Sequence, residues 1–584
     1  MPSGLSTQSK LLAVACVFCA CTLFGCRFVR GVNKKSSGAP SASQAQRSTG
    51  NSWIDGKLPA SVLQGQPRDG GELVFQIEVD PPSLNPIIHS DYWAGQITSN
   101  RVYESLVTVD PYDEPRFRFV PALAETWEIS PDGRVYTFHL RKSVTWHDGH
   151  PFSAADVIAT FDKIQDTTSK AASIRSYTQE IDRYEAIDAS TIRFSLKQPY
   201  FLMMDGVFAS VPIQPSHIIK KMTGVGYSES ATNPINRAPI GTGPYRIEKW
   251  DNGQMIALRR NSGYWGKRPH IDRLVYRIVQ EESVMLELAE RGEVDVVSRV
   301  RANQWIKLGQ SKLQETFNRI LFYEANYRWI GWNLGRPQFQ DPRVRRALTL
   351  LTDRPGIINS LLHGLAKPTV CHFYWASTAC DQTLQPLPYD PVEAVRLLEQ
   401  AGWVDHDGDG IRDFQGHRFA FSFMIPAASD EAARIGTKMK EDFFRAGIDL
   451  KLQRVEWSAF LRRLRTHDFD ACTLLWTGEP RGDPTQIWSS SSIDGGSNYI
   501  GFSNPVADRL MKEARGELDD ARRDRLYQEF GRILYREQPY TWLYVRPTMT
   551  LLNRRIKGVK PTLLGWVLED WWLESEPNRK AGAQ

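Results

Sequence analysis

The sequence is poor in cysteine and histidine, and it lacks the motifs of the common catalytic and metal sites. Only 7 Cys and 11 His occur in 584 residues, and neither HExxH nor, beyond residue 25, CxxC is found, so zinc and thioredoxin-type sites have no support. GxSxG and P-loop motifs are absent as well. The 72 basic and 67 acidic residues form no like-charged run of the kind that binds nucleic acid. We therefore expect neither an enzyme, nor a cofactor, nor a nucleic-acid partner.

The apolar run at the N-terminus predicts export. It covers residues 11–25, which is too short for a membrane span and typical of a signal-peptide core. The sequence LFGC at residues 23–26 resembles a lipobox, in which the cysteine is lipidated, although Phe24 stands where a small residue is usual. We expect a signal peptide at residues 1–25 and a lipid anchor on Cys26 at the periplasmic face of the cell membrane. The alternative is an uncleaved anchor helix.

The chain beyond the signal peptide divides into a polar segment and a long folded body. Residues 26–69 are rich in Ser, Gly, Gln and Arg with little hydrophobic periodicity, so they predict a flexible tether. The body that follows is too long for one hydrophobic core, and we expect two or three domains. In an oxidising compartment Cys371 and Cys380 could close a short loop, although their spacing cannot prove it, and Cys472 would then be a buried, inert thiol.

Residues 122–161 have the densest local structure signals. Alternation of apolar and polar side chains over residues 135–140 predicts a strand. Proline and glycine predict turns at residues 131–133 and 147–149. Ser153, with an acidic residue three positions later, predicts the N-cap of a helix that runs through residue 161. These patterns indicate an α/β unit and no chemistry.

A second helix is predicted from residue 342 onward. Helical spacing places Val344, Leu348 and Leu351 on one face and the arginines of this stretch on the other. We expect these arginines to be solvated or salt-bridged, which is commoner than a ligand clamp.

Motifs of this kind follow one another in an order that resembles a known family. They are the strand, proline-rich loop and helix within residues 72–107, then residues 122–161, 241–265, 339–364 and 389–403. Their order resembles the bacterial extracellular solute-binding proteins of the peptide/nickel class (family 5), which deliver substrates to ABC importers. The resemblance extends from about residue 72 to residue 572.

This resemblance implies an α/β fold of the class II periplasmic-binding-protein type. Two lobes with mixed sheets would flank a cleft, connected by hinge crossovers, and one lobe would have an inserted subdomain. The predicted boundaries are residues 70–111, 236–325 and 546–575 for the first lobe, 112–235 for the subdomain and 326–545 for the second lobe. A monomer of this shape would close on its ligand by rigid-body motion.

The resemblance places the ligand beside residues 472–504. Residues 473–476 predict a buried strand, and open α/β folds bind ligands at the carboxyl ends of strands. In peptide-binding relatives this strand pairs with the peptide main chain, and an aspartate just beyond it binds the peptide's α-amine. Carried over to this chain, the backbone contacts come from Leu475, Trp476, Thr477 and Gly478.

Glu479 takes the place of the amine-binding aspartate. Glutamate is one methylene longer, and the loop has one residue more than in dipeptide-binding relatives, so Asp483 is a rival for the amine. Such a charge-assisted pair is strongest in a closed cleft. The alternative is that both carboxylates only order the loop by accepting bonds from its N–H groups.

Further ligand candidates are mostly aromatic. Trp457 matches a family aromatic that lines a side-chain pocket, and Trp476 is similar in this respect. Asn498 and Tyr499 fall where relatives close the cleft, and Trp93 would face them from the opposite lobe. Plain core packing is the alternative for the tryptophans.

One loop resembles half of an EF-hand. Asp405, Asp407, Asp409 and Asp413 occupy its first, third, fifth and ninth positions, with glycine at the sixth. The twelfth position, where a glutamate would bind calcium with both oxygens, is Gly416. A structural calcium ion is one hypothesis, and a turn ordered by aspartates without metal is the other.

Taken together, these features predict the substrate-binding lipoprotein of an ABC importer. It would capture peptides in the cleft between the lobes by main-chain pairing and by a carboxylate–amine salt bridge, and it would dock on the membrane permease subunits. The alternative is the same fold binding a nickel chelate, a sugar or a cell-wall fragment.

Overall fold

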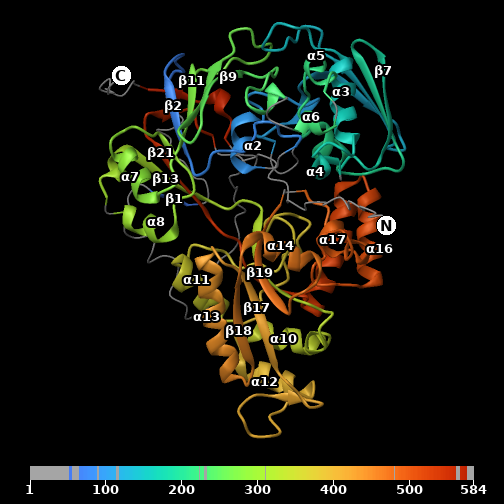
Figure 1. Cartoon of the computed structure of the whole chain (residues 1–584), viewed down its shortest axis with the longest axis vertical. Coiled ribbons are helices and arrows are strands. Elements are labelled where there is room, and N and C mark those ends of the chain that lie inside the picture. Colours follow the sequence, from blue (N-terminus) through green and yellow to red (C-terminus); the bar gives the residue numbers. More distant parts are fainter. Residues whose placement is uncertain are drawn as a thin grey trace, which may run out of the picture.

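Three sheets organise the chain. The computed structural model describes residues 52–54, 65–88, 91–113, 118–175, 177–222, 224–228, 233–309, 311–478, 481–560 and 566–574. The predicted signal peptide, Cys26 and Glu479 lie outside these described residues. In Figure 1 the strands β2, β9 and β11 lie at the upper left, the subdomain with α3 and β7 at the upper right, and β17, β18 and β19 below.

The first lobe is built on a mixed eight-stranded sheet. Its strands, in spatial order, are β1 (Ser52–Ile54), β13 (Phe317–Phe322), β21 (Thr548–Asn553), β12 (Val296–Val297), β2 (Glu72–Ile77), β11 (Arg273–Ile278), β10 (Met255–Arg260) and β9 (Tyr245–Asp251). Alternation along β2 sends Leu73 and Phe75 to one face and Val74 to the other. The helices of this lobe are α2 (Tyr92–Thr98), α7 (Glu282–Glu290), α8 (Ala302–Leu308) and α9 (Leu313–Thr316).

The folded body begins earlier than the predicted tether allows. Residues 52–54 form β1, which pairs in parallel with β13, Ser52 lying opposite Arg319. Gly70 also donates its N–H to the carbonyl of His270 at 2.8 Å. Without β1, the outer backbone groups of β13 would lie at an open sheet edge, and covering such an edge is a common reason for a short added strand.

The inserted subdomain contains a four-stranded antiparallel sheet. Its strands, in spatial order, are β5 (Ala124–Ile129), β6 (Val135–Leu140), β8 (Thr191–Leu196) and β7 (Ile181–Asp188). The predicted strand at residues 135–140 is confirmed as β6, with every second side chain buried. Its helices are α3 (Ala154–Gln165), α4 (Ala172–Arg175), the π-helix η1 (Met203–Phe208), α5 (Ser216–Ile219), α6 (Gly224–Ser228) and the 3-10 turn η2 (Pro234–Asn236). Ser153 and Asp156 form the predicted capping box of α3, which continues past residue 161 to Gln165.

The second lobe is built on a five-stranded mixed sheet. Its strands, in spatial order, are β18 (Asp449–Val455), β17 (Ala420–Pro426), β19 (Ala471–Thr477), β14 (Asn326–Trp332) and β20 (Tyr540–Tyr544). Its helices are η3 (Pro337–Phe339), α10 (Pro342–Leu350), α11 (Arg354–Leu362), α12 (Pro391–Gln400), α13 (Asp430–Arg445), α14 (Trp457–Arg465), α15 (Thr485–Trp488), η4 (Ser490–Ser492), α16 (Pro505–Gly516) and α17 (Asp520–Glu537). Three further two-stranded sheets pair β3 (Val107–Val109) with β4 (Phe119–Pro121), β15 (Asp413–Phe414) with β16 (His417–Arg418), and β22 (Ile556–Lys557) with β23 (Trp572–Leu573). The 3-10 turn η5 (Leu568–Asp570) lies between β22 and β23.

Two short crossovers connect the lobes and lie side by side. Residues 323–325 lead from β13 to β14, and residues 545–547 lead from β20 to β21. The strands pair on both sides of the crossing, β13 with β21 and β14 with β20. Asn326 ties the two connections together, because its side chain donates to the carbonyl of Arg546 at 3.1 Å and accepts from the Arg546 N–H at 2.8 Å. The predicted two-lobed fold with hinge crossovers is confirmed.

Two of the sequence motifs, residues 72–107 and 241–265, meet at one buried carboxylate. Glu104 accepts hydrogen bonds from Thr242 Oγ1 at 2.8 Å, Tyr264 Oη at 2.7 Å and Trp265 Nε1 at 2.9 Å. Burial dominates over these three bonds and raises the pKa of Glu104 to about 7. We call these four residues the Glu104 cluster.

Gly241 allows the backbone of residues 241–265 to lie directly against that of residues 72–107. A Cβ on Gly241 would lie 1.7 Å from the carbonyl oxygen of Val102, so only glycine allows the backbones to approach this closely.

The expectation of a solvated or salt-bridged face on α10 is confirmed for Arg343, which is exposed and pairs with Asp341 at 2.6 Å, and is wrong for Arg345. Arg345 is buried, and its guanidinium donates to the carbonyls of Phe339, Gln340 and Glu537 at 2.7–2.8 Å. Burial lowers its pKa to about 10. The predicted apolar face is nonetheless correct, since Val344, Leu348 and Leu351 are buried.

Both cysteine predictions are confirmed. Cys371 and Cys380 form a disulfide, with Cα atoms 5.9 Å apart. Cys472 is a buried free thiol whose pKa is raised by burial.

Candidate ligand-binding site

The carboxyl half of β19 pairs on one edge only, among the strands that the structure describes. β14 pairs with β19 along its whole length. On the other side β17 pairs only with Ala471 and Cys472, and it ends at Pro426, which has no N–H to donate. Residues 473–477 continue past this ladder. Their outer edge therefore has the main-chain groups that an extended molecule needs to add a strand.

An exposed tryptophan lies at the same edge of the sheet. The strands β17, β18 and β19 run parallel, so their carboxyl ends lie together. Trp457 begins α14 directly beyond β18, is 51% exposed and stacks on Phe460 with ring centroids 5.9 Å apart. Ligands of open α/β sheets bind at this edge. The predicted pocket role of Trp457 stays a prediction, and its exposure is what such a role requires.

Trp476 belongs to the aromatic core of the second lobe. It is buried, and its ring stacks between Trp329 at 5.8 Å and Tyr499 at 6.1 Å. Tyr499 is buried as well. For both rings the structure shows core packing, which was the alternative to a ligand contact.

Exposure increases toward the end of β19. Leu475 and Thr477, on either side of the buried Trp476, are half-buried, and Gly478 is exposed. The N–H of Gly478 donates to the carbonyl of Ala325 at 2.7 Å, in the crossover between the lobes. The end of β19 is thus fixed to the hinge, where the two lobes face each other.

Asn498 has a structural position that the sequence did not predict. It is fully buried, its Nδ2 donates to the carbonyls of Ser489 and Phe502 at 2.9 and 2.8 Å, and its Oδ1 accepts from the Phe502 N–H at 2.9 Å. Its amide is used within the loop around residues 489–502. The expectation that Asn498 reaches a ligand therefore has no support in this geometry.

Asp483 is engaged by protein groups on both oxygens. Its Oδ1 accepts from the Thr485 N–H at 3.0 Å, and its Oδ2 accepts from Tyr200 Oη at 3.2 Å and lies 3.6 Å from Arg515. Tyr200 belongs to the inserted subdomain, whereas the other residues belong to the second lobe. Asp483 orders this contact, which is the alternative to amine binding that the sequence left open.

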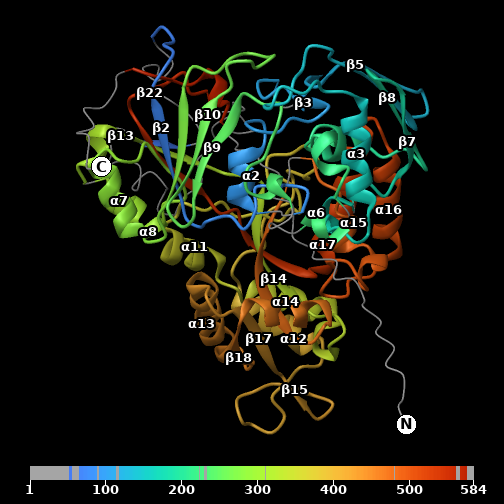
Figure 2. The ribbon, with the colours of Figure 1, turned by 45° about the horizontal axis from the view of Figure 1, so that its top comes forward.

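The contact around Asp483 continues as an arginine-rich interface between subdomain and second lobe. Arg515 reaches Glu180 at 3.1 Å, and Arg481 reaches Asp205 at 3.3 Å. Burial raises the pKa of Asp205 against the opposing effect of Arg481. In Figures 1 and 2 the helices α16 and α17 lie next to the subdomain on this side of the molecule. These contacts hold the loop that begins at Arg481 against the inserted subdomain.

Comparison with known proteins identifies the family. The sequence profile of the bacterial extracellular solute-binding proteins, family 5 (middle region), matches residues 118–498. The chain belongs to this family. The family predicted from the motifs is therefore confirmed, and the chain is an extracellular binding protein.

Individual relatives agree with this assignment over almost the whole chain. The oligopeptide-binding protein AppA of Bacillus subtilis is 28% identical over 88% of this chain and 94% of its own, and the dipeptide-binding protein of Escherichia coli is 25% identical over 84% and 92%. The structure of AppA in complex with a nonapeptide matches with a TM-score of 0.73, covering 87% of this chain and all of that one at 27% identity. NikA from Brucella suis, in complex with Fe(III)-EDTA, shares the fold, with a TM-score of 0.74 at 23% identity over 86% of this chain and all of that one.

The first lobe of this family 5 protein contributes an aromatic and cationic group near the hinge. Trp93 on α2 is buried and packs edge-on against Tyr92 at 4.9 Å. The guanidinium of Arg299 lies 3.8 Å from the centroid of the Tyr92 ring. Burial raises the pKa of Glu324, a residue of the crossover, and the positive charge of Arg299 acts in the opposite direction. The sequence held no signal for Arg299, because a single arginine in a polar loop is unremarkable.

The aspartate loop brings together three of its four predicted metal ligands. Carboxylate oxygens of Asp405, Asp407 and Asp409 lie within 4.8 Å of one another, and all three residues are exposed. Asp405 accepts from the N–H groups of Gly408 and Gly410 at 2.8 and 3.0 Å. Asp413 lies outside the group and pairs with His406 at 3.0 Å. The bonds of Asp405 are those of an aspartate-ordered turn.

The membrane attachment expected at the N-terminus stays a prediction. Among the residues that the structure describes, no helix is both long and apolar enough to cross a bilayer. The predicted lipid attachment at Cys26 lies outside the described residues.

Proposed function

We propose that this protein is the substrate-binding component of an ABC importer and that it captures peptides between its two lobes. The observation that carries the proposal is the open edge of β19 at residues 473–477, beside the hinge. A peptide added to that edge would be held by its main chain, so its side chains need not be specified. The peptide complexes and names of relatives such as AppA support the same ligand class.

Glu479 is our candidate for the ligand's α-amine. It follows directly on Gly478, which the hinge holds in place. The other acidic residue of this loop, Asp483, has its oxygens bound by Thr485 and Tyr200. Of the two acidic residues in this loop, we therefore propose Glu479 as the partner of an ammonium group. Such an ion pair becomes stronger when closure of the lobes excludes water.

The N-terminal segment would keep the protein at its importer. We propose that Cys26 is lipidated after removal of residues 1–25, because the sequence before it has the length and the ending of a lipoprotein signal. Acyl chains on one cysteine hold a protein at a membrane surface without a spanning helix. The ligand-loaded protein would then dock on the permease subunits from the periplasmic side.

A double-mutant cycle tests the ligand and its amine contact together. Protein freed of bound ligand by unfolding and refolding is titrated calorimetrically with a short peptide and with its N-acetyl form. We expect the wild type to prefer the free amine by about 2 kcal/mol, and Glu479→Ala to remove that preference without changing the thermal midpoint. Asp483→Asn is the matched control, and it should leave the preference intact.

Two results would contradict the proposal at different levels. An amine preference that survives Glu479→Ala would reject Glu479 while leaving peptide binding in place. If no peptide binds but a nickel–histidine chelate does, the peptide proposal itself fails in favour of the alternative ligand class.

A further inference from the structure

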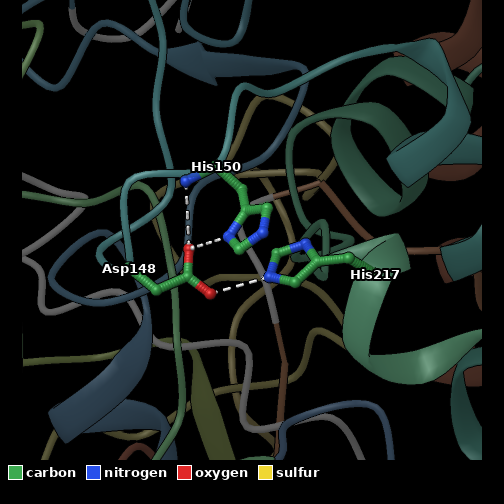
Figure 3. Close-up of side chains that lie close together, drawn as sticks. All are labelled: Asp148, His150 and His217. Carbon is green, nitrogen blue, oxygen red and sulfur yellow. Dashed lines mark hydrogen bonds and ion pairs between the residues drawn. The ribbon is translucent and has the colours of Figure 1, made fainter.

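Two histidines and one aspartate on the inserted subdomain lie close together, and none of them belongs to the proposed peptide site. Figure 3 shows Asp148 facing both imidazoles. Its Oδ2 lies 2.7 Å from Nε2 of His217, and its Oδ1 lies 3.2 Å from Nδ1 of His150. The two rings stack with centroids 4.0 Å apart and planes inclined by 20°. Two nitrogen donors and a carboxylate therefore point into one small volume.

The turn that holds Asp148 and His150 is fixed by buried backbone contacts. Trp146 donates its N–H to the carbonyl of His150 at 2.8 Å, and it accepts from the Gly149 N–H at 2.8 Å. The neighbouring His147 is tied to the first lobe, because its N–H donates to the Gly241 carbonyl at 2.9 Å. Two of the three groups are thus positioned before any ligand arrives.

The third group comes from a separate element that is anchored independently. His217 lies on α5, whose first N–H, that of Ser216, donates to Oδ1 of Asp156 at 2.7 Å. Asp156 is itself buried in the first turn of α3. The site therefore joins the turn at residues 147–150 to α5, 67 positions along the chain from His150 (217 minus 150).

The donor set fits a transition metal better than calcium or magnesium. Imidazole nitrogen suits Zn²⁺, Cu²⁺ and Ni²⁺, whereas calcium and magnesium take oxygen. Neighbouring ligand atoms around a tetrahedral Zn²⁺ lie about 3.3 Å apart when the bonds are about 2.0–2.1 Å. One ligand atom from each of the three residues lies within 4.8 Å of the other two, so the stacked rings must turn toward one ion for all three to bind it.

The site is open to solvent. The side chains of His150, His217 and Asp148 are 57%, 28% and 26% exposed. A metal ion can enter directly, and water can occupy its remaining coordination positions.

We propose that Asp148, His150 and His217 bind a divalent transition-metal ion of the Zn²⁺, Cu²⁺ or Ni²⁺ class on the surface of the inserted subdomain. The ion would connect the turn at residues 147–150 to α5. It is separate from the proposed peptide site, which lies at β19 in the other lobe, so either proposal can fail without the other.

Zinc titration of the full chain tests this site directly. Affinity is measured by competition with a chromophoric zinc chelator, using protein purified without a polyhistidine tag. We expect the wild type to bind zinc at one site. In both His150→Ala and His217→Ala, the zinc affinity of this site should be at least tenfold weaker. His270→Ala is the matched control, because it removes a single histidine–carboxylate pair (His270 to Asp69, 2.8 Å) and should change nothing.

A second readout separates coordination from misfolding. Zn²⁺ should raise the thermal midpoint of the wild type and not that of His150→Ala, whose exposed side chain can be removed without disturbing the fold. Co²⁺ should give visible absorption bands that are absent in the same variant. Equal zinc affinity in the wild type, His150→Ala and His217→Ala would overturn the proposal, as would a wild type that Zn²⁺ does not stabilise.

Discussion

The Glu104 cluster and the end of β19 are both marked by motifs of the family, yet they differ in how their polar groups are used. In the Glu104 cluster, three side-chain donors from one motif bind the buried carboxylate of another, distant motif. At the end of β19, the main chain of residues 473–477 pairs on one edge only, among the described strands. A carboxylate whose hydrogen bonds are all made within the protein holds segments of the fold together. A strand edge whose main-chain groups are still open can pair with a ligand.

Removing the carboxylate of the Glu104 cluster should have the largest effect. Glu104→Ala leaves one buried donor and two half-buried donors without their acceptor, so we expect the free energy of unfolding to fall by about 3 kcal/mol or more. Urea denaturation followed by tryptophan fluorescence measures it. Peptide affinity, measured where the variant is folded, should stay near the wild-type value. A loss of stability below about 1 kcal/mol would remove the contrast between the two regions.

The pH dependence of stability should sharpen the same contrast. Burial raises the pKa of Glu104 to about 7 from 4.5, so folding favours its protonated form. The stabilisation from this protonation is fully present below about pH 4.5 and is lost as pH rises through about 7. The loss amounts to at most about 3 kcal/mol of the free energy of unfolding. Glu104→Gln cannot titrate, so its unfolding free energy should fall less between pH 5 and pH 8 than that of the wild type. Parallel pH profiles for the two proteins would contradict the assignment.

Methylating the peptide backbone should probe the open edge of β19 from the ligand side. In a β-ladder every second residue directs its N–H toward the neighbouring strand. N-methylation at those positions should cost about 1.5 kcal/mol of binding free energy, one lost hydrogen bond, whereas methylation at the intervening positions serves as the control. Calorimetry with a series of singly methylated peptides measures the pattern. A series without alternation would exclude strand addition.

Trp457→Ala should have the smallest effect and should act on binding only. The ring is 51% exposed, so we expect stability to change by less than about 0.5 kcal/mol. Affinity for peptides with bulky side chains should fall by about 1 kcal/mol. Phe444→Ala is the control, because this ring is 65% exposed but lies in the last turn of α13, which returns to the opposite edge of the sheet. Equal effects of the two substitutions would argue against a pocket at Trp457.

The local structure was predictable because its causes are local. The Ser153 cap depends on a partner three residues away, and the alternation in β6 reflects the burial of one face. The Cys371–Cys380 bridge spans only nine positions. Such features are set by neighbours in the sequence, so residue patterns indicate them correctly.

Other outcomes depend on contacts between distant segments. Arg345 was expected on a solvated face, but its guanidinium reaches the carbonyl of Glu537, 192 positions away. Asp483 was a candidate for the ligand amine, and Tyr200 of the subdomain binds it. The meeting of His150 and His217 likewise needs the folded subdomain. No spacing rule connects residues this far apart, so only the structure could place them.

Amide hydrogen exchange tests the central claim most directly. With a tightly bound peptide, exchange should slow by tenfold or more at Thr473, Leu475 and Thr477, because alternation along β19 directs their N–H groups to the open edge. Gly478, whose N–H is already bonded to Ala325, should change little, as should Ala471 and Cys472. If the peptide binds and exchange at residues 473, 475 and 477 is unchanged, the open edge of β19 is not the ligand site.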